Sequence, residues 1–133
     1  MQTLTIGVVE YRMSSDERDV INARYLSTAS MSQQPGTVCR GRAVGDTSNG
    51  FAGRYVIQYF GTQEELVGEF DWELEPVGDG YRLTWRNRKG NLTIPVEEGA
   101  LVLEGFGFPN SDKSIVVAYW MTEETSAAMM GRS

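Results

Sequence analysis

Residues 64–88 have the sequence EELVGEFDWELEPVGDGYRLTWRNR, which contains two alternating patterns joined by a turn. In the first half, apolar or small residues at even positions alternate with acidic residues at odd positions. In the second half, apolar residues at odd positions alternate with basic or polar residues. A period of two residues is typical of a strand with one buried face, and the VGDG segment between the halves is rich in turn formers. The stretch therefore predicts a long antiparallel hairpin.

The two patterns also predict the register of this hairpin. If Trp72 faces Trp85, the apolar residues of both strands share the inner face. The same register places acidic residues opposite basic ones, namely Glu75 opposite Arg82, Asp71 opposite Arg86 and Glu69 opposite Arg88. A shift of one residue would break both sets of pairs. We therefore expect Trp72 and Trp85 to be cross-strand neighbours inside the protein.

Turn-forming residues recur every 8 to 14 positions from Pro35 onward, with short alternating runs between them. Such spacing is typical of an all-β sandwich or barrel. Strands are expected near 2–12, 36–45, 51–60, 64–76, 81–88, 91–96, 100–108 and 113–121. Eight sequential strands can close into a barrel whose lumen holds side chains or one small ligand. The prediction is an all-β chain with one domain over 1–133, an eight-stranded antiparallel meander barrel.

The segment FAGRYVIQYFG, residues 51–61, is apolar at alternate and intervening positions, with Arg54 and Gln58 among the apolar residues. We expect one face of this strand to line the lumen and the other to lie beneath a covering segment. Residues 14–26 are the candidate cover, as a short lid helix, because Ser14 and Glu17 have capping-box spacing; the same residues could instead extend a strand. Residues 122–133 are expected to form a short helical turn or tail.

Composition and charge narrow the chemistry. Lys and Arg number 12 against 18 Asp and Glu, so the net charge of −6 disfavours nucleic acid and membrane surfaces as partners. The chain has no histidine, which removes imidazole bases and histidine-ligated metals, and we expect neither a metal nor a cofactor. Cys39 is the single cysteine and is expected to be a core residue. The N-terminal residues lack an export signal, so a cytoplasmic location is expected, and a homodimer is left open.

The segment GFAGRYVIQYF, followed by a meander ending in VVAYWMT, resembles the calycin pattern of lipocalin and avidin type barrels. In that family a glycine and an aromatic residue on an early strand pack across one barrel end. Here the family's tryptophan is replaced, with Phe51 and Tyr55 nearby, and the motif lies on the third expected strand. No biotin-contacting residues can be carried over, so biotin is not implied. A second likeness, architectural only, is to small β-barrel cyclases that close polyketide spiro rings by [4+2] cycloaddition beneath an N-terminal lid.

The expected function is the binding of an apolar small molecule in the barrel lumen. Aromatic residues would form the walls, and Gln58 or Arg54 would orient a polar group of the ligand. The candidate ligand-binding residues are Tyr55, Gln58, Tyr59, Trp72, Tyr81, Trp85, Tyr119 and Trp120.

Two alternatives are left open. The first is a cofactor-free cyclase or isomerase of natural-product biosynthesis that folds a polyketide-type substrate inside the barrel and accelerates reaction through orientation. Glu104 and Glu10, each in an apolar strand, are its candidate catalytic acids, although either carboxylate could point outward instead. The second alternative is that the aromatic residues fill a solid barrel core.

Overall fold

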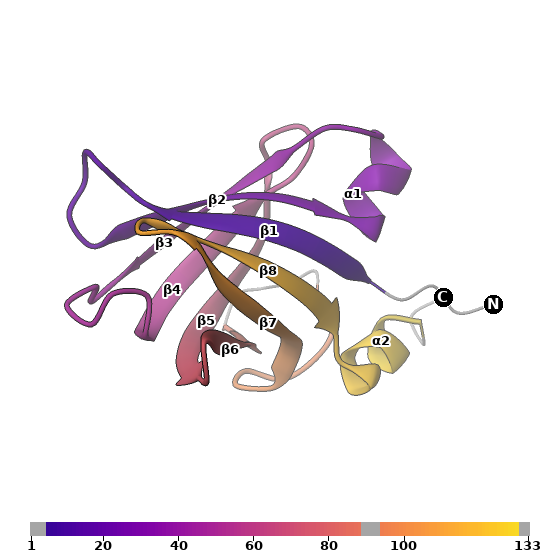
Figure 1. The fold of residues 1–133 in the computed structure, drawn as a ribbon. Helices are drawn as coiled ribbons and strands as arrows, with labels where there is room; N and C mark the ends of the chain where they lie inside the picture. Colours follow the sequence, from indigo (N-terminus) through magenta and orange to yellow (C-terminus); the bar gives the residue numbers. More distant parts are fainter. Residues whose placement is uncertain (1–4, 89–93, 131–133) are drawn as a thin grey trace.

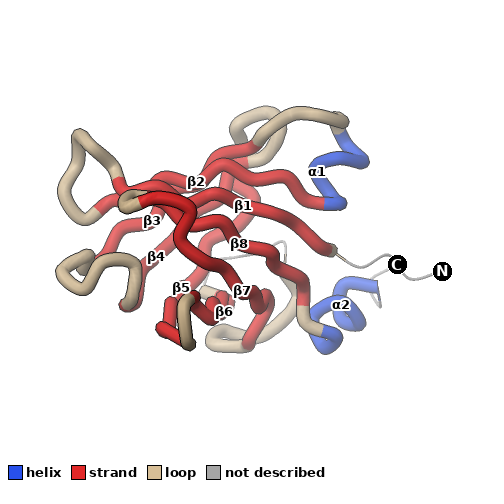
Figure 2. The backbone as a smooth tube through the Cα atoms, viewed as in Figure 1, coloured by secondary structure: helices blue, strands red, loops and turns tan. Residues whose placement is uncertain are grey.

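The computed structural model describes residues 5–88 and 94–130, which form a closed β-barrel with two short helices (Figure 1). Each strand pairs antiparallel with the next, and the last strand pairs with the first, as the meander prediction requires. The strands are β1 (Ile6–Met13), β2 (Val20–Ser27), β3 (Cys39–Gly45), β4 (Gly53–Phe60), β5 (Leu66–Val77), β6 (Gly80–Asn87), β7 (Leu101–Ser111) and β8 (Ser114–Met121). The helices are α1 (Thr28–Gln33) and α2 (Glu123–Met130), and both lie at the same end of the barrel (Figure 2).

The predicted hairpin is confirmed as β5 and β6. Trp72 pairs with Trp85 in the ladder, and their ring centroids lie 6.3 Å apart in the barrel interior. The charged residues face outward in the predicted register, with Asp71 opposite Arg86 and Glu75 opposite Arg82. Arg88 pairs with Glu69 at 3.0 Å and with Asp71 at 2.7 Å.

Two of the expected elements differ from the structure, although the number of strands is as predicted. Residues 20–27 form β2, so the helix predicted over 14–26 is wrong. The alternation there is that of a strand, since Ile21 and Ala23 are buried while Asn22 is exposed. The short helix near the N-terminus follows β2 at 28–33 instead. Of the strand predicted over 91–96, residues 91–93 lie outside the described part, 94–96 are not in a strand, and β6 pairs directly with β7.

Residues 51–61 have apolar residues on both faces because exposed apolar side chains lie on the outer face, not because another segment covers that face. In β4, Tyr55, Ile57 and Tyr59 point inward, while Arg54 and Gln58 point outward. The prediction of a segment over the outer face of β4 is wrong, because the segment assigned to that role forms part of β2 in the barrel wall. The apolar residues on that face, such as Val56, remain accessible to solvent.

Glycines opposite aromatic residues allow this narrow barrel to hold many large rings. Tyr119 lies opposite Gly7 in the β1–β8 ladder, and Tyr59 lies opposite Gly41 and Gly68 in the ladders on either side of β4. A Cβ atom on Gly7 would collide with the ring of Tyr119, and one on Gly41 would lie 2.9 Å from Cδ1 of Tyr59. The rings therefore lie against the wall of the barrel, where a side chain on the neighbouring strand would exclude them.

The barrel end opposite the helices is closed by side chains. The loop before β4 buries Phe51 there, and the hydroxyl of Tyr55 donates to the carbonyl of Phe51 at 3.0 Å. The ring of Phe51 meets that of Tyr81 edge to face, with centroids 6.3 Å apart. Access to the interior is therefore limited to the end that carries α1 and α2.

The contact between Gly7 and Tyr119 gives a test of this packing. We expect Gly7→Ala to lower the free energy of unfolding by roughly 1–3 kcal/mol, because the added methyl group overpacks the ring. Urea denaturation followed by tryptophan fluorescence measures the change. The control is Val8→Ala, which alters the exposed neighbour on the same strand and should change stability by less than about 0.5 kcal/mol. Equal effects of the two substitutions would contradict the proposed packing.

Candidate functional site

A cavity of about 530 Å³ opens at the helix-bearing end of the barrel. Its walls come from the ends of β2, β4, β7 and β8, the segment at the start of β5, and both helices. The lining residues are Thr5, Tyr25, Ser27, Ala29, Gln33, Tyr59, Glu65, Leu66, Val67, Gly68, Phe70, Ile94, Val102, Leu103, Tyr119, Met121 and Met129. Most of these side chains are apolar, and the volume lies within the range of sites for small molecules.

Tyr59, one of the lining residues, belongs to a hydrogen-bonded group of three aromatic side chains, which we call the cavity floor. The indole Nε1 of Trp85 donates to the hydroxyl of Tyr59 at 2.6 Å. The same hydroxyl lies 2.7 Å from the hydroxyl of Tyr11, so Tyr59 joins β1, β4 and β6 across the lumen. Below this level the lumen is filled by packed rings, with Tyr11 and Trp72 centroids 4.5 Å apart. The group therefore separates the filled part of the barrel from the open part.

Two further tyrosines form the wall above this floor. The ring of Tyr25 meets that of Tyr59 edge to face at 5.3 Å, and its hydroxyl donates to the carbonyl of Phe60 at 2.7 Å. Tyr119 of β8 lies against Gly7 of β1, the strand between β8 and β2. Burial raises the pKa values of Tyr25, Tyr59 and Tyr119, so all three remain neutral near pH 7. The polar atoms of the wall are thus uncharged hydroxyl groups.

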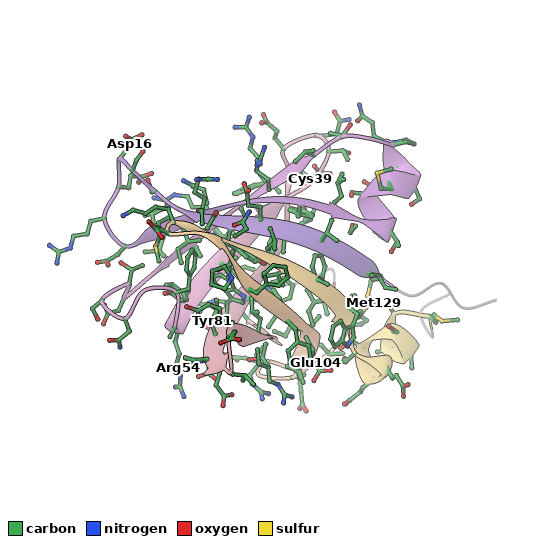
Figure 3. The ribbon with its side chains drawn as sticks, in the orientation of Figure 1. Asp16, Cys39, Arg54, Tyr81, Glu104 and Met129 are labelled. Carbon is green, nitrogen blue, oxygen red and sulfur yellow. The ribbon has the colours of Figure 1, made fainter. Side chains whose placement is uncertain are left out.

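Local sequence signals place the two helices at the mouth. Ser27 caps α1 by accepting a hydrogen bond from the backbone of Ser30, whose side chain in turn accepts from the backbone of Ser27. The backbone N–H of Thr122 donates to the carbonyl of Val102 at 2.9 Å, which fixes the start of α2 against β7. Figure 3 shows Met129 of α2 at this end of the barrel, remote from Asp16 at the closed end.

The described lining of the cavity contains one charged side chain. Glu65 lies at the rim, where its carboxylate accepts from the backbone N–H of Gln63 at 3.0 Å. Neither lysine nor arginine is among these lining residues. The site therefore suits an uncharged, largely apolar molecule better than an anion.

The structure separates the predicted ligand-binding residues into three groups. Tyr59 and Tyr119 line the cavity. Tyr55, Trp72 and Trp85 are buried in the filled part of the core, with Trp85 reaching the site through its bond to Tyr59. The remaining three, Tyr81, Gln58 and Trp120, lie at the closed end or on the outer face.

The polar groups expected to orient a ligand or catalyse a reaction are also on the outer face. The amide of Gln58 donates to Glu69 at 2.7 Å, and Arg54 pairs with Glu73 at 2.6 Å. Figure 3 shows Arg54 and Glu104 on the outside of the barrel, where Arg82 lies 3.8 Å from the carboxylate of Glu104.

The second candidate acid, Glu10, is likewise outside the cavity. Its carboxylate accepts a hydrogen bond from Arg24 at 2.8 Å, and this interaction lowers its pKa. A carboxylate held in the charged form by arginine is poorly suited to donate a proton. Neither predicted acid is therefore placed to contact a molecule in the cavity.

Several cavity residues were missed by the sequence analysis. The sequence places Tyr25 in the predicted lid helix and Phe70 on the inner face of the predicted hairpin. Met129 lies in α2, in the segment for which the sequence predicts a short helical turn or tail. Alternation of 21–25 could have identified Tyr25 as an interior residue, whereas the position of Met129 depends on how α2 packs.

A second surface feature lies on the outside of the barrel, over β1, β2, β7 and β8. We call it the outer apolar face, and it consists of Ile6, Val8, Leu26, Phe106, Phe108, Val116, Ala118 and Trp120. Phe106 and Phe108 are 53% and 60% exposed. A groove of about 530 Å³ runs along this face and is bordered by the ion pair of Glu10 and Arg24.

Within residues 5–88 and 94–130, no group of three or more metal-ligating side chains could hold a metal ion. No helix in the same ranges is long and apolar enough to cross a membrane.

Comparisons with known proteins identify no family for this chain. No protein-family model matches the chain, and neither the curated proteins nor the solved structures give a match. The structure agrees with the resemblance to calycins at the level of architecture alone, a closed eight-stranded antiparallel barrel.

The buried tyrosines predict how the fold responds to alkali. Burial raises the pKa of Tyr55 to about 12 and moves the pKa values of Tyr11, Tyr25, Tyr59 and Tyr119 in the same direction. The folded chain then holds these protons more tightly than the unfolded chain, whose tyrosines ionise near pH 10. Stability should be unaffected by these groups below about pH 10 and fall as the pH rises above that value.

The measurement is a titration of tyrosinate absorbance alongside near-ultraviolet circular dichroism. We expect most of the tyrosinate signal to appear together with the loss of tertiary structure. Ionisation of all six tyrosines at ordinary pKa, with the fold intact, would contradict the burial described here.

Proposed function

We propose that this barrel binds an apolar small molecule in the end cavity. The observation that carries the proposal is the cavity itself, about 530 Å³ in volume, with mostly apolar walls. Its polar lining residues are Thr5, Tyr25, Ser27, Gln33, Tyr59, Glu65 and Tyr119. A barrel filled with side chains throughout would have no such space. The glycines opposite Tyr59 and Tyr119 support the proposal, because they let both rings lie against the wall and so keep the lumen above them open.

The closed lower half of the barrel would serve as a rigid base for this site. Ligand sites are more selective when their first contacts are held by packed neighbours. Tyr59 is held by hydrogen bonds to two other strands, and Phe70 packs against it with ring centroids 6.0 Å apart. The two helices at the mouth would cover part of a bound molecule and exclude water from it.

The cyclase alternative lacks a matching observation in the cavity. Its candidate acids, Glu104 and Glu10, both lie on the outer face and are engaged with arginines. The cavity supplies shape and neutral hydroxyls, which suffice for binding. We therefore put binding forward as the function that the geometry supports best.

A substitution at the mouth tests the proposal. Ala29 is exposed at the mouth on α1, so Ala29→Trp should fill the opening without disturbing the core. With Nile red as the neutral probe, we expect saturable binding to the wild type with micromolar affinity. The substitution should weaken this binding by tenfold or more, about 1.4 kcal/mol. Fluorescence titration measures both values.

The matched control is Ser32→Trp, which adds the same side chain at an exposed position of α1 outside the described cavity lining. It should leave the affinity for Nile red unchanged. Equal affinities in wild type and both variants would place the dye elsewhere and contradict the proposed site. A double variant of Phe106 and Phe108 to serine would then show whether the dye occupies the outer apolar face.

We further propose that the outer apolar face packs weakly against a second copy of the chain. Its charged neighbours Glu10 and Arg24 are already paired, so a second barrel could cover the groove without leaving a charge unpartnered. Stable interfaces use about 20–30 residues on each side, and this face has fewer. The expected association is therefore weak and dependent on concentration.

Sedimentation velocity over a wide range of protein concentration tests this dimer. The wild type should sediment faster as its concentration rises into the high micromolar range. The variant with Phe106→Ser and Phe108→Ser should remain monomeric, while Val77→Ser, at an exposed apolar position of β5, should behave as the wild type. A monomeric wild type at all concentrations would contradict the dimer.

A further inference from the structure

The hydrogen-bonded group at the cavity floor contains three donor protons but only two hydrogen bonds. Three donors meet there, namely the Nε1–H of Trp85 and the hydroxyls of Tyr11 and Tyr59. One bond runs from Trp85 to Tyr59, and the other joins the two hydroxyls, with one of them as donor. One hydroxyl proton is therefore left without an acceptor among the described residues.

The surroundings of the two tyrosines indicate which hydroxyl keeps that proton. Tyr11 is fully buried, and its ring packs against Trp72 in the filled part of the barrel. A spare proton on Tyr11 would have no acceptor in this apolar core, which costs free energy. Tyr59 can accept from both Trp85 and Tyr11, since a phenol oxygen has two lone pairs. The proton without an acceptor among the described residues is then that of Tyr59, the one member of the group that lines the cavity.

We propose that Tyr59 donates this proton in a hydrogen bond to a carbonyl oxygen of an uncharged ligand in the cavity. The proposal rests on the proposed function and specifies the ligand class, an apolar molecule with a ketone, ester or amide group. Tyr59 thereby becomes the residue that orients the ligand, a role that the sequence analysis gave to Gln58 or Arg54.

The electrostatics of the cavity support a neutral acceptor. Its described lining has no lysine or arginine, and Glu65 at the rim would repel an anion. A carboxylate buried here would lose its hydration without gaining a cation. Tyr59 accepts two hydrogen bonds, which polarise its O–H bond and strengthen it as a donor. Burial also raises its pKa, so the proton stays in place.

The experiment uses two probes of nearly equal shape, 6-propionyl-2-(dimethylamino)naphthalene and its 6-propyl analogue, which lacks the carbonyl oxygen. The measured quantity is the ratio of their affinities, because this ratio cancels contacts common to both. In the wild type this ratio includes the bond to Tyr59. Tyr59→Phe should lower the preference for the ketone by about three- to tenfold, the usual range for one neutral hydrogen bond.

Tyr11→Phe is the matched control, since it removes a hydroxyl from the same group while leaving the proton of Tyr59 in place. We expect it to lower the preference for the ketone much less than Tyr59→Phe does, because Tyr59 keeps its proton and loses only one of the two bonds that polarise it. If Tyr59 instead donates to Tyr11 in the wild type, Tyr11→Phe would release the proton of Tyr59 and raise the preference for the ketone. That increase would overturn the proposed assignment of the proton.

Tyr59→Phe leaves Trp85 and Tyr11 without a partner and can therefore lower stability, so a second measurement uses the wild type alone. The infrared carbonyl stretch of the bound ketone should lie at lower frequency than in an alkane solvent, as a hydrogen bond requires. An unshifted band would overturn the proposal whatever the variants do. If both probes bind with a ratio unaffected by Tyr59→Phe, the role of Tyr59 fails and the binding function stands; if neither probe binds, both proposals fail.

Discussion

The hydroxyl of Tyr59 is the point on which the interior of this barrel depends. It contacts Trp85 at 2.6 Å and Tyr11 at 2.7 Å, and so connects β1, β4 and β6 through the middle of the lumen. The sheet itself joins only neighbouring strands, whereas this group joins strands that are not adjacent. By contrast, the indole N–H of Trp72 in the filled half has no hydrogen-bond partner among residues 5–88 and 94–130, and the ring of Tyr11 packs against this indole.

The position of this group along the barrel axis divides the molecule into two parts. On one side, Trp72, Leu83 and Ile115 fill the lumen, and Phe51 closes the end. On the other side, the rings of Tyr59 and Tyr119 lie against glycines, and the space above them stays open. An eight-stranded barrel is wide enough for either outcome. The choice between a filled and an open lumen is therefore made locally, by which residues face each aromatic ring across the sheet.

The hairpin of β5 and β6 could be predicted in detail because two independent patterns, apolar and charged, agree on one register. No second pattern is available for residues 14–26, where capping-box spacing favours a helix and a strand is the open alternative. The predicted fold class is correct because the predicted and observed numbers of strands are both eight. The structure contains β2, which was not predicted, and the strand predicted over 91–96 is not among the described strands. Local pattern thus predicted the architecture better than the identity of each strand.

The site was harder to predict for a geometrical reason. Alternation shows which residues point into a barrel, but it carries no information about depth along the axis. Tyr55 and Tyr59 are both interior residues of β4, yet Tyr55 helps to close one end while Tyr59 lines the cavity at the other. Depth follows from strand register around the whole barrel. Helix packing, which places Met129 at the mouth, adds a contribution that no strand pattern contains.

A ligand at this floor would be coupled to the stability of the fold. The hydroxyl that we assign to the ligand also joins β1, β4 and β6, so a bound carbonyl group would be held by the same atoms that hold the interior together. A ligand that binds only the folded state stabilises that state by mass action. Packing alone requires the rings of Tyr11, Tyr59 and Trp85 but does not require a third donor proton in their group. A ligand that accepts this proton would give the third donor a use.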